Sequence, residues 1–171
     1  MRCTDQRADV GHARAQGDRR CYPDRRMTSA PPPTPAPLTL DLSQYADIVN
    51  NAFYNQAVCV IATSNGADVD LALKGSFMVW DSEHLAYWER GLNETLAAIR
   101  ANPRVAVLVR PKGASPMRFY GEAHVVEDPA QRDAVYQRVI PEEQGRDPDK
   151  KGLGVLIRVD RIRQGPRTVN R

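Results

Sequence analysis

The sequence predicts a mainly β protein that folds as a small, partly open barrel of antiparallel strands. The 171-residue chain holds about seven strand-like runs and three helical ones, and tight turns join most of the strands. Strands joined by tight turns are antiparallel, and so many of them in a small domain must close or stack to protect their edges. Two runs, residues 57–63 and 105–109, are apolar on both faces. We therefore expect the barrel wall to be covered by a helix or by a second subunit.

The first half of the folded part is expected to be a helix followed by four strands. Apolar residues at helical spacing predict the helix near residues 41–53, with Asp41 or Ser43 as its N-cap. The dipeptide Asn65-Gly66 is a strong signal for a hairpin turn. Period-two alternation and turn residues predict the strands at residues 57–63, 69–73, 76–80 and 84–88.

The second half is expected to hold two helices and three strands. In "ERGLNETLAAIRANPRVAVLVR" a short helix opens after a polar cluster and is stopped by Pro103. Asp128 as N-cap and Pro129 at the first helical position predict a helix in "EDPAQRDAVYQRVI". The strands are expected at residues 105–109, 117–126 and 153–162, with a polar loop at residues 141–151.

Residues 1–37 are expected to be a disordered tail ending in a proline-rich linker, and residues 38–171 to be the folded domain. The tail has no apolar periodicity, and "APPPTPAP" favours extended, polyproline-like backbone. Two alternatives stay open: the arginine-rich arm tethers an acidic partner, or translation starts at Met27. Disorder is the favoured interpretation, because acidic residues interrupt every basic run.

The charge and the cysteines limit the classes of partner and site. Residues 1–26 hold seven Arg and four Asp, so the formal net charge of +3 resides there and 17 basic and 17 acidic side chains remain. A neutral folded part gives no electrostatic argument for nucleic acid or a membrane. The sequence has neither a signal peptide nor an apolar membrane span. Cys3, Cys21 and Cys59 form no disulfide framework or metal-binding spacing, so we expect a reducing cytoplasm and no metal.

The polar cluster before the short helix has two interpretations. Arg90, Asn93 and Thr95 either cap the helix, or they hold an anion beside the free amides of its first turn. Glu94 places a negative charge at the same point. No dinucleotide, P-loop, zinc-protease or catalytic-triad pattern occurs, and the catalytic residues stay unknown.

A second polar constellation lies on the strand "MRFYGEAHVV". The period of a strand puts its odd positions on one apolar face and Arg118, Tyr120, Glu122 and His124 on the other. This polar face is either solvated or lines a ligand pocket, and Gly121 permits a close backbone approach. The segment "ALKGSF" adds Lys74 and Ser76 at a strand junction, where solvated turn residues are the simpler interpretation.

Four segments, in this order, resemble the pyridoxamine 5′-phosphate oxidase-like family, the flavin-binding split barrels. They are "VCVIATSNGADVDLAL", "LAYWERGLNETLAAIRANPRVAVLVR", "RFYGEAHVVEDPAQRD" and "DPDKKGLGVLIRVDRI". The pieces "NPRVAV" and "RFYGEA" are the most diagnostic. The resemblance covers about residues 38–164 and implies an FMN-binding split-barrel domain over residues 38–171. It also implies a homodimer, with two FMN molecules in the grooves between its subunits.

The resemblance also implies, position by position, which residues bind the cofactor. Arg90, Asn93 and Thr95 would hold the FMN phosphate at the helix start. The ribityl chain or ring would lie along Lys74 and Ser76. Trp88 and Arg118 would line the cavity.

The function that the resemblance implies is an FMN-dependent oxidoreductase acting on a small organic molecule by hydride transfer. Too few of the substrate-side residues of the vitamin enzyme are retained for a true pyridoxamine phosphate oxidase. Relatives with this barrel also bind deazaflavin or haem, so a non-catalytic barrel for flavin, deazaflavin or haem is the alternative, which Glu94 favours. A nucleic-acid-binding module with an arginine arm is a third hypothesis, and it predicts steep salt dependence.

Overall fold

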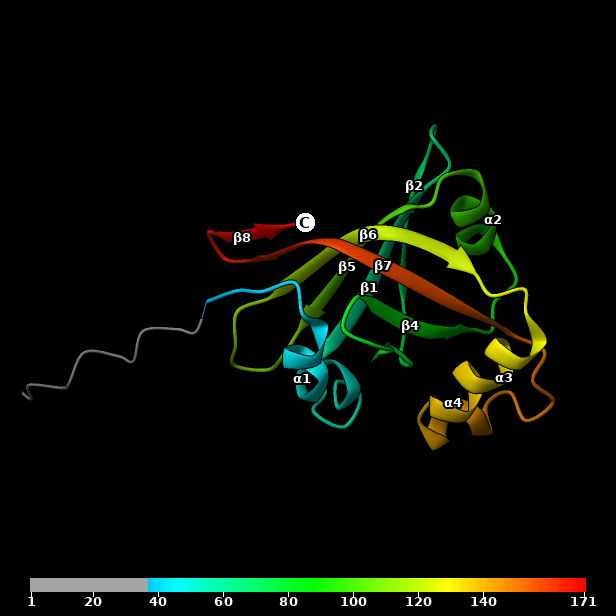
Figure 1. Cartoon of the computed structure of the whole chain (residues 1–171). Helices are drawn as coiled ribbons and strands as arrows, with labels where there is room; N and C mark the ends of the chain where they lie inside the picture. The colour runs from blue at the N-terminus through cyan, green and yellow to red at the C-terminus, as the bar shows by residue number, and fades with distance from the viewer. Residues whose placement is uncertain (1–36) are drawn as a thin grey trace, which may run out of the picture. The chain divides into compact units, whose positions relative to one another are not determined.

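The computed structural model describes residues 37–171, in which one antiparallel sheet is accompanied by short helices (Figure 1). The predictions for the tail and its linker concern residues that lie outside this range, apart from Pro37. The helical elements are η1 (Leu42–Tyr45), α1 (Ala46–Asn50), α2 (Glu94–Ala101), α3 (Pro129–Arg138) and α4 (Pro141–Gly145). The strands are β1 (Val58–Ser64), β2 (Val69–Leu73), β3 (Met78–Val79), β4 (His84–Glu89), β5 (Arg104–Arg110), β6 (Met117–Val125), β7 (Leu153–Gln164) and β8 (Arg167–Asn170).

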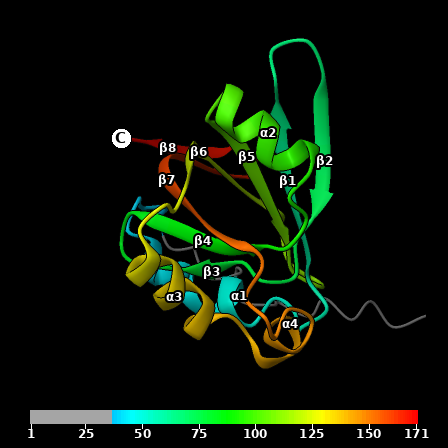
Figure 2. The ribbon, with the colours of Figure 1, turned by 90° about the vertical axis from the view of Figure 1, so that its right-hand side faces the viewer.

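The sheet has the strand order β2-β1-β5-β6-β7-β4-β3, and β8 pairs with β7 beside this path. Every pairing is antiparallel, and the strands curl into part of a barrel (Figures 1 and 2). The prediction of a mainly β, partly open antiparallel barrel is therefore confirmed. Within the described chain, the ends of the path are the short strand β3 and the apolar strand β2.

The main core fills the concave side of the sheet. Ile61, Val107, Phe119 and Ile157 come from four neighbouring strands and have no exposed surface. Helices η1 and α1 add apolar side chains to the same cluster, and the rings of Tyr45 and Phe119 meet edge to face at 5.9 Å. Such aromatic pairs add to the free energy gained from the buried area alone.

A smaller core lies between α3 and the strands β4 and β7. Val135 and Tyr136 of α3 pack on Trp88 and Leu156, and all four side chains are buried. The rings of Trp88 and Tyr136 are 5.1 Å apart in an edge-to-face arrangement. This packing fixes the C-terminal end of β4, where the candidate site begins.

Helix α2 lies against β1, β2 and β6, and its start faces the end of β4 (Figure 2). Its own residues Leu96 and Ile99 are buried and lie about one turn apart, as expected for the apolar face of an amphipathic helix. Pro103 follows at once, and its carbonyl accepts a hydrogen bond from Ala123 of β6. The chain then runs directly into β5, as the sequence predicts.

Most local predictions are confirmed. Asp41 caps η1 by accepting from Ser43, and Asp128 caps α3 by accepting from Gln131. The odd positions of β6 face the core and the even ones face outward. Four elements differ. The expected helix near residues 41–53 is the 3₁₀ turn η1 followed by the short helix α1, and the expected strand at residues 76–80 is the two-residue β3. The expected loop at residues 141–151 begins with the five-residue helix α4, and the chain after β7 turns back as β8. None of the helices between residues 37 and 171 is long and apolar enough to cross a membrane.

Gly121 marks an irregularity in the pairing of β6 with β7. The register shifts between Tyr120 and Gly121, and the two backbones approach closely there. A Cβ atom at residue 121 would lie 2.0 Å from the carbonyl oxygen of Arg158. The close approach expected at this glycine is therefore made by a neighbouring strand, and glycine is required because any side chain would separate the strands.

We expect Gly121→Ala to lower the free energy of unfolding by at least about 3 kcal/mol, because backbone atoms cannot move aside cheaply. Urea denaturation of the purified variant measures this change. Gly145→Ala is the control, since no atom lies within 4 Å of the added methyl group and the φ angle is not positive. Equal stability of the two variants would contradict the close packing of β6 on β7.

Candidate functional site

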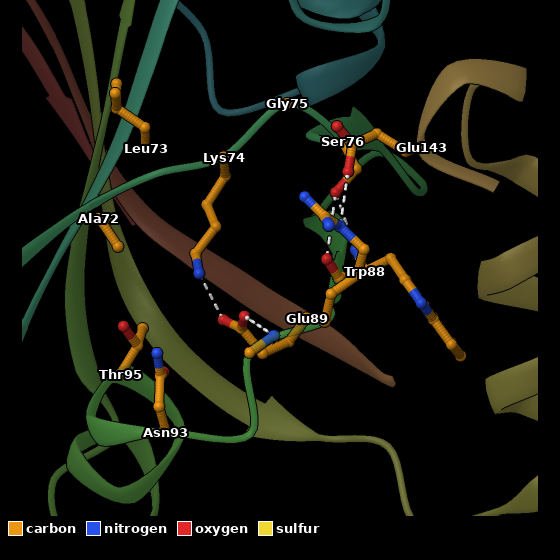
Figure 3. A pocket seen from close by; sticks show the side chains of 12 residues that line it. Ala72, Leu73, Lys74, Gly75, Ser76, Trp88, Glu89, Asn93, Thr95 and Glu143 are labelled. Atoms are coloured by element: carbon orange, nitrogen blue, oxygen red, sulfur yellow. Dashed lines mark hydrogen bonds and ion pairs between the residues drawn. The ribbon is translucent and has the colours of Figure 1, made fainter. Parts of the chain in front are cut away.

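A cavity of about 460 Å³ lies between the end of β2, the end of β4, the start of α2 and helix α4 (Figure 3). Cavities of roughly 300–1,000 Å³ are typical of small-molecule and cofactor sites. Most of its wall is polar. The lining residues are Ala72, Leu73, Lys74, Gly75, Ser76, Trp88, Glu89, Arg90, Gly91, Asn93, Thr95 and Glu143.

Six of the seven residues expected to bind a cofactor line this one cavity. They come from two separate segments of the chain: Lys74 and Ser76 from one, and Trp88, Arg90, Asn93 and Thr95 from the other. Arg118 does not line the cavity, because it is exposed on the outward face of β6. Its assignment to the cofactor therefore stays a prediction that involves a different face.

Lys74 forms a buried ion pair at the floor of the cavity. Its Nζ donates to Oε2 of Glu89 at 2.6 Å, and only 11% of the Lys74 side chain and 3% of the Glu89 side chain are exposed. The other oxygen of Glu89 accepts from the backbone amide of Gly91 at 3.1 Å. Figure 3 shows the lysine pointing across the cavity toward this carboxylate. The charge of Lys74 is thus balanced within the protein.

The hydroxyl of Tyr87 lies in the same buried region. Tyr87 has no exposed surface, and its hydroxyl finds no partner among the described residues. Burial and the nearby charge of Glu89 raise the pKa of Tyr87 above its ordinary value. Tyr87 is therefore a neutral group behind the Lys74–Glu89 pair throughout the physiological pH range.

Arg90 is also held by a carboxylate. Its Nε donates to Oε2 of Glu143 on α4 at 3.1 Å, and Nη1 of Arg146 pairs with the other oxygen of Glu143. Glu143 is buried, whereas 42% of the Arg90 side chain is exposed. The carboxylate thus has two cationic partners, one on each oxygen.

The start of α2 provides hydrogen-bond donors to the cavity. Asn93 precedes the helix but its side chain does not cap it, and Figure 3 shows that side chain turned toward the cavity. The first backbone bond of the turn is donated by Ala97 to Asn93, so the amides before Ala97 precede the helical ladder. Helix capping was one of the two interpretations of this cluster, and the Asn93 side chain makes no such capping bond.

The acidic residues near the helix start have separate positions. Glu94 lines another cavity, together with Asp68 and Asp70, rather than the one described above. Thr95 is buried and donates its hydroxyl proton to Asp70 at 3.0 Å. The negative charge of Glu94 is thus directed away from Arg90, although Asp70 lies behind Thr95.

Ser76 and Trp88 join two walls of the cavity. The Ser76 hydroxyl accepts a hydrogen bond from the backbone amide of Trp88 at 3.1 Å and donates one to the Trp88 carbonyl oxygen at 3.3 Å. The indole Nε1 of Trp88 donates to Oδ2 of Asp147 at 2.8 Å. Trp88 therefore borders the cavity where its backbone bonds to Ser76, while its ring packs on Tyr136 and its indole nitrogen is bonded to Asp147 (Figure 3).

Asp147 anchors the segment behind Trp88. Its carboxylate also accepts the backbone amides of Lys151 and Gly152, at 2.9 and 2.8 Å. Burial by itself raises the pKa of Asp147, but the bonds from Gly152, Trp88 and Lys151 outweigh it, and the pKa is lower than usual. Three donors thus hold the ionised form.

The sequence patterns did not indicate Glu89, Glu143 or Asp147. Glu89 is the last residue of an apolar strand and precedes Arg90, and a charged residue at a strand end gives no signal of its own. The other two lie in a segment expected to be a polar loop. Pro141 at the start of α4 was the one local signal for a helix there.

The outward face of β2 is a second exposed feature beside the cavity. Val69, Leu71 and Leu73 are 74%, 69% and 76% exposed, although strands rarely expose three large apolar residues in a row. Cross-strand pairing continues this face: Leu73, Val60, Leu108 and Arg118 form one row over four strands. We call the three β2 residues the apolar strip.

The cavity suits a ligand with an anionic group and a polar chain. Arg90, Asn93 and the first amides of α2 can donate to a phosphate, and this donor set matches the chemistry of helix-start anion sites. Its volume fits a cofactor of moderate size. Because Glu89 and Glu143 already balance Lys74 and Arg90, an entering anion has to compete with a carboxylate.

The comparisons with known proteins identify the fold and the family. A model of the family described as "Pyridoxamine 5'-phosphate oxidase" matches residues 46–164. The fold resembles HupZ of Group A Streptococcus, with a TM-score of 0.60, 23% identity and coverage of 75% of this chain and 97% of that one. No curated protein sequence matches the chain.

Two further solved structures share the fold. General Stress Protein 26 of Bacillus anthracis has a TM-score of 0.58 and 17% identity, and the match covers 75% of this chain and 99% of that one. An FMN-binding protein from Syntrophomonas wolfei has a TM-score of 0.56 and 14% identity, over 73% and 88%. At these identities the likeness concerns the fold alone.

We expect Asp147→Asn to lower the free energy of unfolding by about 1–3 kcal/mol at neutral pH, because an amide cannot accept all three bonds. The lowered pKa of Asp147 means that its contribution is complete above its unfolded pKa of roughly 3.9 and is lost as the pH falls through the folded value. The difference between wild type and variant should therefore shrink in acid. Denaturant titrations at several pH values measure it, and a constant difference would contradict this role.

Proposed function

Because the chain belongs to the pyridoxamine 5′-phosphate oxidase family, we propose that it binds FMN in the cavity beside α2 and acts as a flavin-dependent oxidoreductase. The observation that carries the proposal is the meeting of six expected cofactor residues, from two separate segments, around one cavity. The FMN-binding protein from Syntrophomonas wolfei, which shares the fold, supports this choice of flavin. The proposed setting is the cytoplasm, and a true pyridoxamine phosphate oxidase activity is not part of the proposal.

In this proposal the phosphate of FMN lies at the start of α2. The terminal nitrogens of Arg90, the side chain of Asn93 and the first amides of the helix donate to it. Thr95 supports the turn through its bond to Asp70. Lys74 and Ser76 line another part of the cavity, where they form hydrogen bonds with the hydroxyl groups of the ribityl chain.

The flavin supplies the chemistry of hydride transfer, and the protein supplies position and electrostatics. The buried Lys74–Glu89 pair fixes an ammonium group and a carboxylate in the cavity wall at 2.6 Å from each other. Trp88 keeps the wall beside Ser76 in place, because its backbone bonds to the Ser76 hydroxyl and its ring is packed on Tyr136. The substrate is a small organic molecule that reaches the open side.

The second candidate is a non-catalytic barrel for flavin, deazaflavin or haem. The ion pairs of Lys74 with Glu89 and of Arg90 with Glu143 favour it, since neither cation is free to act as an acid or to bind an anion. Oxidation of a reduced nicotinamide by the FMN-loaded protein separates the two candidates. Steady turnover supports the enzyme, whereas tight binding without turnover supports the carrier.

We further propose that the protein is a homodimer formed through the apolar strip and the sheet face behind it. Exposed apolar patches on a sheet next to a cavity are typical of subunit interfaces. Leu73 belongs both to the apolar strip and to the cavity lining, so a partner seated on the strip would reach the cavity. Arg118 lies in the same cross-strand row as Leu73 and would then serve the partner's cavity.

We expect Arg90→Ala to weaken FMN binding by about 1.5–3 kcal/mol, the value of a hydrogen bond to a charged group. Titration of the purified apoprotein with FMN, followed by flavin fluorescence, measures the affinity. Arg100→Ala is the control, because Arg100 lies in the last turn of α2, at the other end of the helix from the proposed phosphate, and its side chain is about half exposed. Equal affinity of the wild type and Arg90→Ala would place the phosphate elsewhere.

We expect Leu71→Glu to convert the dimer to a monomer, because two carboxylates would be buried against an apolar face. Sedimentation velocity of the wild type and the variant reports the subunit number. Thr168→Glu is the control, since Thr168 is an exposed position on β8. A wild type that is monomeric at all concentrations, or a variant that remains dimeric, would contradict the proposed interface.

A further inference from the structure

We infer that Glu143 is a resident counter-anion that occupies Arg90 until a phosphate-bearing ligand replaces it, while the Lys74–Glu89 pair remains intact. The inference rests on the proposed function of the cavity and assigns a new role within it. Glu143 would then determine how strongly the site prefers a phosphate over uncharged ligands of the same shape. The two cations of the cavity differ in three respects, and each difference singles out Arg90.

The first difference is exposure. The side chain of Arg90 is 42% exposed, and that of Lys74 is 11% exposed. A partly exposed ion pair contributes little net stability, because water solvates the separated charges. Separation of the buried Lys74–Glu89 pair would leave an uncompensated charge in the interior, which is strongly unfavourable.

The second difference is the number of cations on each carboxylate. Glu143 is bound by Arg90 on Oε2 and by Arg146 on Oε1. If Arg90 turns away, Arg146 still balances the buried Glu143. The cation paired with Glu89 among the described residues is Lys74 alone, and the other oxygen of Glu89 accepts the neutral amide of Gly91. Arg146 therefore makes the release of Arg90 possible without stranding a buried charge.

The third difference is the geometry of the donors. Arg90 uses Nε for Glu143, and its two terminal nitrogens remain for a ligand that lines up with the guanidinium plane. Lys74 instead directs its ammonium group at Glu89 with a short 2.6 Å contact. A phosphate presents more charge and more acceptor oxygens than a carboxylate, so it can outcompete Glu143 for the guanidinium.

The position of Glu143 is set by the chain around it. It is 3% exposed, and a Cβ atom at Gly75 would lie 2.7 Å from its Oε1. The loop after β2 thus passes close to the carboxylate and holds it in the cavity wall. Glu142, the preceding residue, is exposed, and its partner among the described residues is the Tyr54 hydroxyl, which donates to it at 2.9 Å. The two neighbours therefore form a matched pair for a test of charge near the cavity.

The experiment titrates the full-length wild type, Glu143→Gln and Glu142→Gln with FMN and with riboflavin, which lacks the phosphate. Without its competitor, Arg90 is free for the phosphate, so Glu143→Gln should bind FMN about two- to fivefold more tightly, as expected for loss of one partly exposed pair. Riboflavin affinity should not change, and Glu142→Gln should match the wild type for both compounds.

Arg146→Ala provides the opposite test. Without Arg146, Glu143 depends on Arg90 alone and should hold it more firmly, so FMN affinity should fall although Arg146 does not line the cavity. A purely structural role of Glu143 would weaken FMN binding in both variants, and that result would overturn the inference. Unchanged FMN affinity in Glu143→Gln, or an equal gain for riboflavin, would overturn it too.

The outcomes also separate this inference from the proposed function. If the wild type binds FMN but the variants do not change in opposite directions, the counter-anion role fails and the proposed function stands. If the wild type binds neither FMN nor riboflavin, both the proposed function and the inference fail. Thermal melts of each variant identify any change in affinity that follows from misfolding.

Discussion

The pairing of β7 with its neighbours is the constraint on which the remaining structure depends. This 12-residue strand bonds to β6 along one edge and to β4 along the other, and its last residues also pair with β8. The strand neighbours of β4 in the described sheet are β7 and β3, so this pairing, together with the packing of α3, places the end of β4. Glu89 and Leu153 face each other in the register, so the site's central carboxylate lies where β7 begins. Gly121 permits the close contact that keeps β6 and β7 together.

Local patterns predicted the elements because their causes are local. The alternation along β6, the caps Asp41 and Asp128, and the turn at Asn65-Gly66 each depend on residues within a few positions. The polar cluster around Arg90 was found in the same way, and the cavity forms at that point. The short elements α4 and β8 were missed because five and four residues are too few for a periodic signal.

The charge balance of the cavity could not be predicted, because its partners are distant in sequence. Lys74 and Glu89 are 15 residues apart, and Arg90 and Glu143 are 53 apart. The curled sheet and the placement of α4 bring them together. The sequence therefore indicated the cations as candidate ligands for an anion, while the structure adds that each already has a carboxylate. That addition changes the expected binding from simple attraction to an exchange of one anion for another.

The apolar strip has a consequence for newly synthesised chains. β2 is an edge strand, so its outer backbone groups and its three exposed side chains are both available to another strand. A folded chain whose apolar strip is uncovered thus presents an unpaired apolar edge, and overexpression at high concentration would favour aggregation through that edge. Yield in a recombinant host should depend on how slowly the chain is made as much as on how well it folds.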